Sequence, residues 1–281
     1  MKKTRNPLKI IRLIIQIVLF TFMLILFLDF TGTLQTNFAF MARIQFVPAL
    51  LSLSFIIIGL LILLTLLFGR IYCSTICPLG TLQDIFIRIS NLFYKNNINR
   101  FRYKKAYNVL RYSVLGIAIV GFFMGFSVII TLLDPYGAFG RISANIFRPI
   151  LISVNNVSTK LLYHTNDYVI SNAVPALSSL IVAIITFVCL MVMCVVSGRL
   201  YCNTLCPVGG VLSLISRFSL FKIHFNKEKC VNCKTCKVVC KSNCIDSQNM
   251  LVDNSRCVMC LNCLGQCNSK SLKFGIDINK K

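Results

Sequence analysis

The chain has 281 residues, of which 56% are hydrophobic and 14% charged, with a formal net charge of +22. Its mean hydropathy of +0.76 lies far above the balance of an ordinary soluble domain, which excludes a purely soluble globular protein. The positive charge would also suit nucleic acid. However, no recognition motif accompanies it and it gathers beside apolar runs, so we expect no nucleic-acid partner.

Four apolar runs are long enough to cross a lipid bilayer as helices, which takes about 20 residues. These transmembrane helices are expected at Ile10–Leu28, Phe46–Phe68, Val114–Leu133 and Ala176–Val196. The first run follows a basic start and would also suit a signal peptide. It is too long for the apolar part of one and no A-x-A site follows, so we expect a retained anchor. The shorter stretch Ile146–Val154 contains Arg148 and Pro149 and is expected at the interface.

The lysines and arginines predict the orientation. Five lie between the N-terminus and Arg12, seven between Gly69 and Lys105, and thirteen after residue 197. By contrast, segments 29–45 and 134–175 hold one and three. The positive-inside rule therefore predicts a multi-pass protein of the bacterial cytoplasmic membrane. Its two termini and all its candidate cluster cysteines are then cytoplasmic.

The two halves of the apolar region repeat. "GRIYCSTICPLGT" at 69–81 matches "GRLYCNTLCPVGG" at 198–210, and "LDFTG" at 28–32 matches "LDPYG" at 133–137. Two helices per unit return the chain to the same side, so the repeats are expected to be parallel. This topology places four cysteines at one depth, where symmetry brings them together: Cys73, Cys77, Cys202 and Cys206.

Each half also has an acidic residue after its first helix. Asp29 and Asp134 are followed by glycine three residues later, as in a helix-terminating turn. The functional alternative is that they accept protons from a quinone headgroup bound between the halves. Both readings place them near the outer membrane surface.

The last part of the chain carries two C-x2-C-x2-C-x3-C runs, at 230–240 and 257–267. This is the ligand pattern of bacterial ferredoxins with two [4Fe–4S] clusters, in which the fourth cysteine of each run serves the other cluster. Cluster 1 is therefore assigned Cys230, Cys233, Cys236 and Cys267. Cluster 2 is assigned Cys257, Cys260, Cys263 and Cys240. Structural zinc closes with four ligands and does not explain eight, and a reducing cytoplasm disfavours disulfides.

Two departures from the ferredoxin pattern stand out. Lys241 and Asn268 follow the last cysteine of each run, where proline is usual, and Cys244 is an alternative ligand to Cys240.

Haem is not expected, because the two histidines, His164 and His224, lie outside the apolar runs and no C-x-x-C-H occurs. No glycine-rich dinucleotide fingerprint is present either.

The fold class expected from these features is an α-helical integral membrane protein. Residues 1–220 form four transmembrane helices as two parallel two-helix repeats, and residues 221–281 form a small α+β ferredoxin-like domain.

The Cys-x3-Cys-Pro motif places both thiols on one face of a helical turn, and its proline restricts the chain directly afterwards. A redox dithiol, a four-thiolate metal site and a copper(I) site all suit this geometry, whereas packing is the non-functional alternative. The duplication of the motif favours a functional role over packing. We expect all four thiolates to converge on iron or on an additional cluster. Arg70 and Arg199 would neutralise thiolate charge as well as anchor the chain. Cys189 and Cys194 have no counterpart in the first half and are expected to pack.

This order of features resembles the NapH family, the membrane iron–sulfur proteins accessory to periplasmic nitrate reductase. The same membrane core recurs in NosR-type proteins, which add a flavin-binding domain, and in CcoG-type proteins, which add C-terminal sequence. The resemblance covers nearly the whole chain, and the twin motifs are its most specific part. It implies a quinol dehydrogenase component that passes electrons to redox partners of an anaerobic respiratory chain.

The sequence therefore predicts a membrane-bound electron carrier. Quinol from the membrane pool binds between the repeats, and its electrons leave singly through iron–sulfur centres to ferredoxin-like or cytochrome partners. Electrons could also flow in the opposite direction, from the cytoplasm through the ferredoxin-like domain into the membrane. Two other functions compete: a metallocentre assembly factor or cupric reductase that uses the Cys-x3-Cys-Pro thiols, and a redox-sensing membrane regulator.

Overall fold

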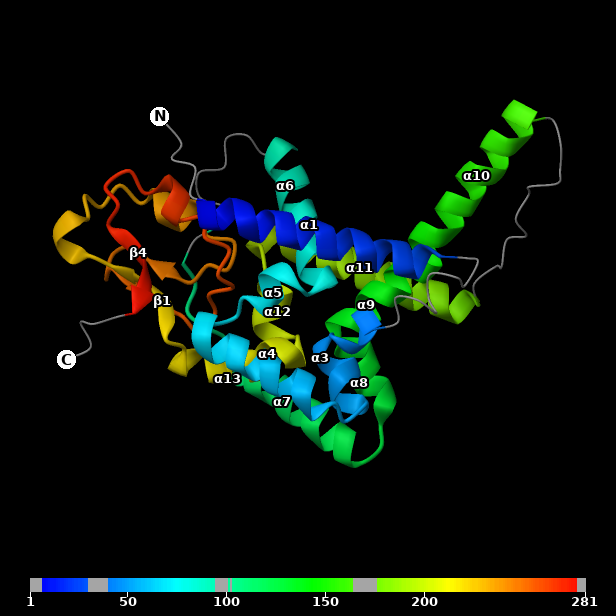
Figure 1. Ribbon diagram of the computed structural model, residues 1–281, viewed down its shortest axis with the longest axis horizontal. Coiled ribbons are helices and arrows are strands. Elements are labelled where there is room, and N and C mark those ends of the chain that lie inside the picture. The colour runs from blue at the N-terminus through cyan, green and yellow to red at the C-terminus, as the bar shows by residue number, and fades with distance from the viewer. Residues whose placement is uncertain (1–6, 30–39, 94–100, 102, 164–175, 277–281) are drawn as a thin grey trace.

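The computed structural model describes residues 7–29, 40–93, 101, 103–163 and 176–276. The molecule is elongated, with its long helices along the main axis and its strands gathered at one end (Figure 1). The first half contains α1 (Pro7–Leu28), α3 (Phe46–Leu51), α4 (Phe55–Phe68), α5 (Tyr72–Thr75) and α6 (Pro78–Phe93).

The second half contains α7 (Asn108–Phe123), α8 (Ser127–Leu133), α9 (Pro135–Ile142), the π-helical turn η1 (Ser143–Phe147), α10 (Arg148–Tyr163), α11 (Leu177–Ser197), α12 (Leu200–Thr204), α13 (Pro207–Ile215) and η2 (Ser216–Phe218). The C-terminal part contains β1 (Phe221–Phe225), η3 (Lys227–Lys229), α14 (Thr235–Val238), β2 (Ile245–Asp246), β3 (Leu251–Val252), η4 (Leu264–Gln266) and β4 (Leu272–Ile276). The expectation of a mainly helical protein is confirmed.

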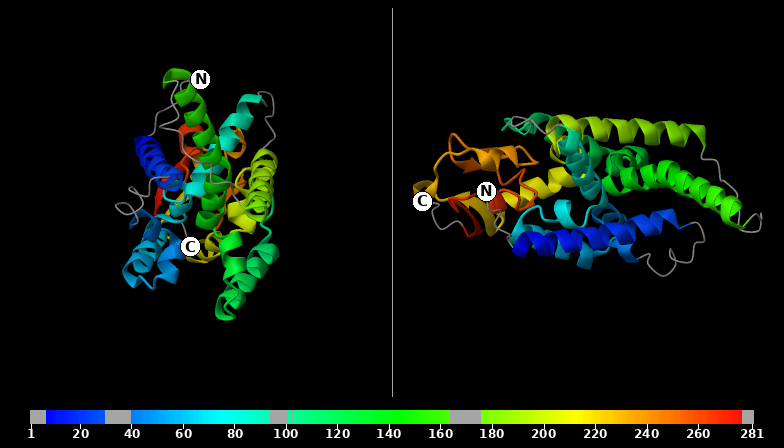
Figure 2. Two further views of the ribbon diagram at one scale, coloured as in Figure 1. Left: turned by 90° about the vertical axis from the view of Figure 1, so that its right-hand side faces the viewer. Right: turned by 90° about the horizontal axis from the view of Figure 1, so that it is seen from above.

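Among the described helices, α1 and α11 are long and apolar enough to cross a membrane. They match the first and fourth expected spans closely. Neither has a glycine or proline inside it that would interrupt its hydrogen bonds. Both run along the long axis, on opposite sides of the helical part, and both contact α6 and η1 (Figure 2).

The second and third expected spans are interrupted, which differs from the four uniform helices predicted. The run 46–68 breaks after α3, where Leu53 has a φ of 51°, and α4 then packs against α3. The run 114–133 breaks at Gly125, whose φ of 76° suits glycine, and α8 then packs against α7. The main helices α4 and α7 have 14 and 16 residues, fewer than a straight crossing needs.

The stretch Ile146–Val154, which is expected at the interface, is helical. It is part of a helical track formed by α9, η1 and α10, which is continuous from Pro135 to Tyr163. The turn η1 contacts both α1 and α11, whereas α10 projects away from the other helices (Figure 1).

The packing of the helices follows the same scheme in both halves. Helix α6, which follows the first motif, contacts α1 of its own half and α11 of the other. Helix α13, which follows the second motif, contacts α7 of its own half and α4 of the other. In each half, the helix after the motif therefore packs on a helix of the other half. This packing brings the two cysteine motifs together at the centre of the helical part.

The C-terminal part is small and packs directly on the helices. Strand β1 pairs antiparallel with β4, with Phe221 opposite Ile276, and β2 pairs with β3. The ring of Phe221 stacks on Phe68 at the end of α4, with centroids 5.4 Å apart. The expected boundary after residue 220 falls between η2 and β1.

Candidate functional site

Each Cys-x3-Cys-Pro motif forms a sharp connection between two helices. Helices α4 and α11 end at Gly69 and Gly198, whose φ values of 67° and 68° belong to the left-handed region that glycine adopts easily. One short helical turn follows and carries the first cysteine. The second cysteine directly precedes the proline that begins the next helix, a favoured position for proline.

The two motifs are held together by their arginines, each of which serves the other half. The Arg70 guanidinium donates to the carbonyl oxygen of Cys202 at 2.7 Å, and that of Arg199 donates to the carbonyl oxygen of Cys73 at 2.6 Å. Both arginines are completely buried. Their hydrogen bonds hold the two motifs together. Arg70 also places positive charge beside a thiol, because its Nη2 lies 3.9 Å from Cys73 Sγ.

The four motif cysteines lie in one buried cluster of side chains, as the repeat predicts. Burial raises the pKa of Cys77 and Cys206 well above the ordinary thiol value, and neighbouring motif cysteines raise it further. Burial also raises the pKa of Cys202 to about 11, although Arg199 opposes this. A reactive dithiol requires a lowered pKa, whereas a bound metal deprotonates its thiols itself. This environment disfavours a reactive redox dithiol.

Two glycines allow each motif to turn tightly back on itself, with the helix after the motif packed against the backbone of its first cysteine. A Cβ added at Gly80 would lie 2.3 Å from the carbonyl oxygen of Cys73, and one added at Gly209 would lie 2.1 Å from that of Cys202. We expect Gly80→Ala and Gly209→Ala each to destabilise the protein by roughly 1–3 kcal/mol, because backbone must move to admit the methyl group. Thermal unfolding followed by circular dichroism measures the effect.

The matched control is Gly116→Ala on α7, where an added Cβ meets nothing within 4 Å. Alanine also favours a helix interior, so this variant should be as stable as the unmodified protein or more so. Equal unfolding temperatures for all three variants would show that the two motifs do not turn this tightly.

The C-terminal cysteines surround two small cavities, in the groups that the spacing predicts. A cavity of about 320 Å³ is lined by the cluster 1 set, Cys230, Cys233, Cys236 and Cys267. A second of about 320 Å³ is lined by the cluster 2 set, Cys240, Cys257, Cys260 and Cys263. In both cavities the fourth cysteine comes from the other run. The donor set is thus all thiolate, as iron–sulfur clusters require.

A fifth cysteine shares the second cavity. Cys244 Sγ lies 3.5 Å from Cys240 Sγ, and a hydrogen bond from Cys244 lowers the pKa of Cys240 to about 7. No three His, Cys, Asp or Glu side chains within the described ranges are close enough to hold one metal ion. A four-iron cluster spaces its ligands more widely, and the two four-cysteine cavities fit such a group.

A buried ion cluster that the sequence did not predict joins the membrane motifs to the second cavity. Asp84 on α6 is 3% exposed and pairs with three cations: Arg199 at 2.9 Å, Lys241 at 3.1 Å and Arg12 at 3.8 Å. Lys241 follows Cys240 directly, in the position where ferredoxins usually have proline. The lysine that replaces this proline therefore joins the C-terminal part to helix α6 through its ion pair with Asp84. The only sign of this ion cluster in the sequence is Asp84 itself, one of eight acidic residues in a strongly basic chain.

The two candidate quinone-site acids fall in different situations. Asp134 is buried and caps α9 by accepting a hydrogen bond from the Gly137 amide at 2.7 Å. Its Oδ1 has no hydrogen-bond partner among the described residues. The preceding carbonyl, that of Leu133, accepts from the Tyr201 hydroxyl at 2.8 Å, so Asp134 lies next to the second motif. The Asp29 amide bonds to Ile25, and residues 30–32 of its motif lie outside the described residues.

The remaining predicted residues are placed as follows. Cys194 is buried on α11 beside Ile87, whereas Cys189 is exposed. His224 lies on β1 opposite Lys273, and His164 lies outside the described residues.

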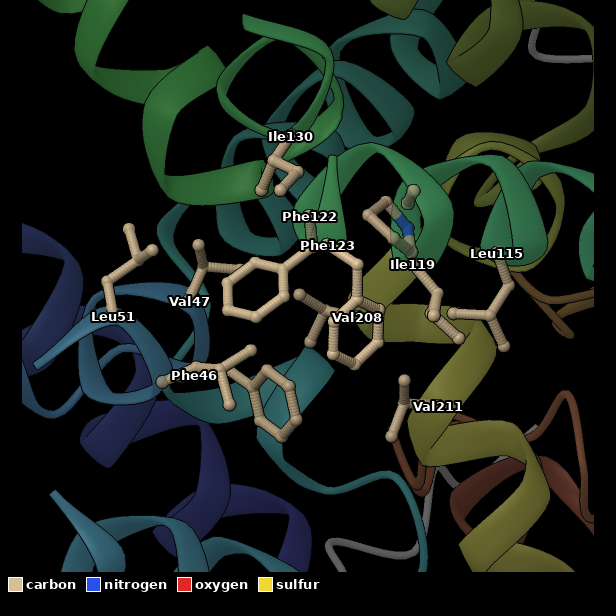
Figure 3. Close-up of a pocket in the computed structure, with 13 residues that line it drawn as sticks. Phe46, Val47, Leu51, Leu115, Ile119, Phe122, Phe123, Ile130, Val208 and Val211 are labelled. Atoms are coloured by element: carbon tan, nitrogen blue, oxygen red, sulfur yellow. The ribbon is translucent and has the colours of Figure 1, made fainter. Parts of the chain in front are cut away.

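An apolar groove of about 660 Å³ lies between the halves, close to the second motif (Figure 3). Its walls come from α3, α7, α8 and α13, and it begins at Pro207 and Val208, directly after Cys206. Phe46 lines the other side, and its amide donates to the Tyr72 hydroxyl of the first motif at 3.1 Å. The groove therefore touches both motifs through their immediate neighbours.

Comparison with known proteins gives the class. A family model described as a 4Fe-4S binding domain matches twice, at residues 50–97 and 179–227, so each match contains one Cys-x3-Cys-Pro motif. No solved structure is significantly similar. The doubled match and the relatives named below support the class of ferredoxin-type iron–sulfur proteins of electron transport.

Three curated relatives narrow this class. The chain is 34% identical to the uncharacterised protein MJ0749 of Methanocaldococcus jannaschii, over 26% of this chain and 29% of that one. It is 23% identical to YccM of Escherichia coli, whose name assigns it provisionally to electron transport, over 83% and 60%. It is 22% identical to the ferredoxin-type protein NapH of Haemophilus influenzae, over 73% and 62%. The chain thus spans less than two thirds of the length of all three.

The chain is therefore similar to the NapH-like ferredoxin-type proteins. The resemblance predicted from the twin motifs is confirmed.

Proposed function

We propose that the protein is a membrane-bound electron carrier that oxidises quinol and passes electrons to partner redox proteins. The observation that carries the proposal is a hydrogen-bonded connection between the two cysteine regions. Arg70 donates to the carbonyl oxygens of both Cys202 and Ser255, at 2.7 and 3.2 Å. Arg12 donates to that of Cys260 at 3.3 Å. Electron carriers must lie close together, and these bonds hold the two regions in contact.

We further propose that α1, α4, α7 and α11 lie in the bacterial cytoplasmic membrane as two parallel repeats. Large apolar side chains cover their outer surfaces: Ile14 on α1 is 57% exposed, Ile56 on α4 is 89%, Val109 on α7 is 84% and Ile185 on α11 is 57%. Such surfaces on four helices suit contact with lipid chains. The distribution of lysines and arginines supports a cytoplasmic position for the proposed C-terminal domain, residues 221–281.

Three iron–sulfur sites are proposed, two in the four-cysteine cavities and one at the twin motif. The family model for a 4Fe-4S binding domain supports the third, because its matches cover the motifs and end before Cys230. The Gly209 amide donates a hydrogen bond to Cys206 Sγ at 3.3 Å, which a thiolate can accept. Contacts of this kind orient thiolates and tune a site. A [4Fe–4S] cluster, when bound, accepts and releases one electron at a time, which couples a two-electron donor to one-electron partners.

The chain's own residues provide a place for quinol. The apolar groove between the halves suits an isoprenoid quinol, and Asp134 lies one helical turn after Ile130 in the groove wall. Oxidation of one quinol releases two electrons and two protons, and a proton acceptor is needed nearby. Burial raises the pKa of Asp134 to about 6, although the Gly137 and Tyr136 amides oppose this. A carboxylate with this pKa is suited to accept a proton near neutral pH.

Asp134→Asn tests this assignment. Asparagine still caps a helix but cannot accept the proton, so we expect quinol oxidation to slow about 100-fold without loss of folding. The assay is anaerobic reduction of the reconstituted protein by a short-chain quinol, with cluster reduction followed by electron paramagnetic resonance. Asp246→Asn, on the C-terminal surface, is the matched control and should react normally. Quinol that leaves every cluster oxidised, while copper(II) is reduced, would instead support the metallocentre assembly factor.

A further inference from the structure

A small basic pocket lies where the start of α7 meets the end of α11 and the C-terminal domain. None of the side chains that line it is acidic. The polar groups that matter for its chemistry are Lys104, Lys105, Arg111, Arg256, Ser242 and Asn243. The proposed function makes no use of this pocket.

Arg111 is the central residue of the pocket. It is 2% exposed, and its Nε donates to the carbonyl oxygen of Asn203 at 2.7 Å. Its two terminal nitrogens are buried and make no hydrogen bond within the described part of the chain. Leaving a buried guanidinium unpaired is costly, so a partner for these nitrogens is expected.

The neighbouring charges do not supply that partner. Arg70 is itself a cation and repels Arg111, and the Tyr112 hydroxyl beside Arg111 already accepts a hydrogen bond from Arg217 at 2.7 Å. Asp253 acts on Arg111 through space, but its oxygens already accept hydrogen bonds from the Ser255 hydroxyl and from Arg256, both at 2.6 Å. The pocket therefore keeps an excess of positive charge.

Other donors border the same space. Arg256 is held by Asp253 and by the Lys104 carbonyl oxygen, while its Nη2 is buried without a hydrogen-bond partner among the described residues. The Ser242 hydroxyl is likewise buried and without such a partner there. Lys105 is exposed beside the pocket. Guanidinium groups in a fixed orientation are suited to an oxyanion with several acceptor oxygens.

We propose that this pocket binds a phosphate-bearing anion, supplied either by the headgroup of an acidic phospholipid or by free phosphate. The pocket borders Ser197, the last residue of α11, which is one of the two described helices long enough to cross a membrane. Basic pockets at such helix ends are where anionic headgroups bind. The proposal does not depend on quinol oxidation, because it concerns other residues.

The test uses the full-length protein in an uncharged detergent at constant ionic strength, with thermal unfolding followed by circular dichroism. The probes are inorganic phosphate, dioctanoylphosphatidylglycerol, and dioctanoylglycerol as a lipid without phosphate. We expect a phosphate-bearing probe to raise the unfolding temperature saturably, because a ligand that binds the folded state stabilises it. In Arg111→Gln the concentration needed should rise at least about tenfold. Arg88→Gln, an exposed arginine on α6 outside the pocket, should respond like the unmodified protein.

The outcomes separate the two sources. Saturable stabilisation by phosphatidylglycerol alone identifies a lipid headgroup, and stabilisation by inorganic phosphate identifies the free anion. The proposal is overturned if neither probe acts, if dioctanoylglycerol acts equally, or if Arg111→Gln responds normally. Should Arg111→Gln fail to fold, Lys105→Gln replaces it. This exposed substitution should weaken binding several-fold, and an unchanged response would overturn the proposal as well.

Discussion

Replacing Asp84 with asparagine is expected to lower the free energy of unfolding by about 3–5 kcal/mol, because removing one partner leaves buried charges uncompensated. The carboxylate pairs with Arg199, Lys241 and Arg12, which come from three separate parts of the chain. The unfolding temperature should fall by about 10 °C. Asp246→Asn is the control: this exposed carboxylate bonds only to its own turn, so its loss should change stability by less than about 1 kcal/mol.

The pH dependence of this effect has a definite sign. Burial alone would raise the pKa of Asp84, but Arg199, Lys241 and Arg12 together hold it well below the ordinary carboxyl value. A depressed folded-state pKa stabilises the protein above the unfolded-state pKa of about 3.9, and this stabilisation is lost as pH falls below it. The difference in stability between the unmodified protein and Asp84→Asn should be constant above about pH 5 and narrow below about pH 4. A difference that widens in acid would contradict the assignment.

Replacing the four motif cysteines by serine is expected to remove about four irons per chain. With three [4Fe–4S] clusters the unmodified protein would contain about twelve irons, and the variant would keep the eight of the two C-terminal clusters. The substituted residues are Cys73, Cys77, Cys202 and Cys206. Anaerobic quantification of iron and acid-labile sulfide measures the change. Equal contents of about eight irons in both proteins would rule out a cluster at the twin motif.

Cys189→Ser is the matched control for this experiment. Cys189 is a cysteine of the same apolar region, but it is exposed on α11. Its substitution should leave iron and sulfide unchanged. Loss of iron in this variant would indicate general damage by serine rather than removal of ligands.

The local parts of the candidate site could be predicted from sequence because their geometry is local. The C-x2-C-x2-C-x3-C spacing brings three cysteines to one cavity, and the structure places the fourth from the other run there as well. The meeting of the two Cys-x3-Cys-Pro motifs followed from their repetition, which implies equivalent positions in the two halves.

The interruptions of the second and third helices could not be predicted from hydropathy. An apolar run has the same composition whether it continues straight or turns back, and the turns depend on single residues such as Leu53 and Gly125. The Asp84 cluster was missed for a different reason. Its partners Arg12, Arg199 and Lys241 are separated by long stretches of chain, and each alone resembles an ordinary basic residue next to an apolar run.

The exchange of arginines between the motifs has a consequence for biosynthesis. Arg70 is made early, but its hydrogen-bond acceptors belong to Cys202, Asn203 and Ser255. The first motif thus cannot reach its final structure until the segment that carries Ser255 has been made and has folded against the helices. A cluster proposed at the twin motif would therefore be inserted only after that segment is in place.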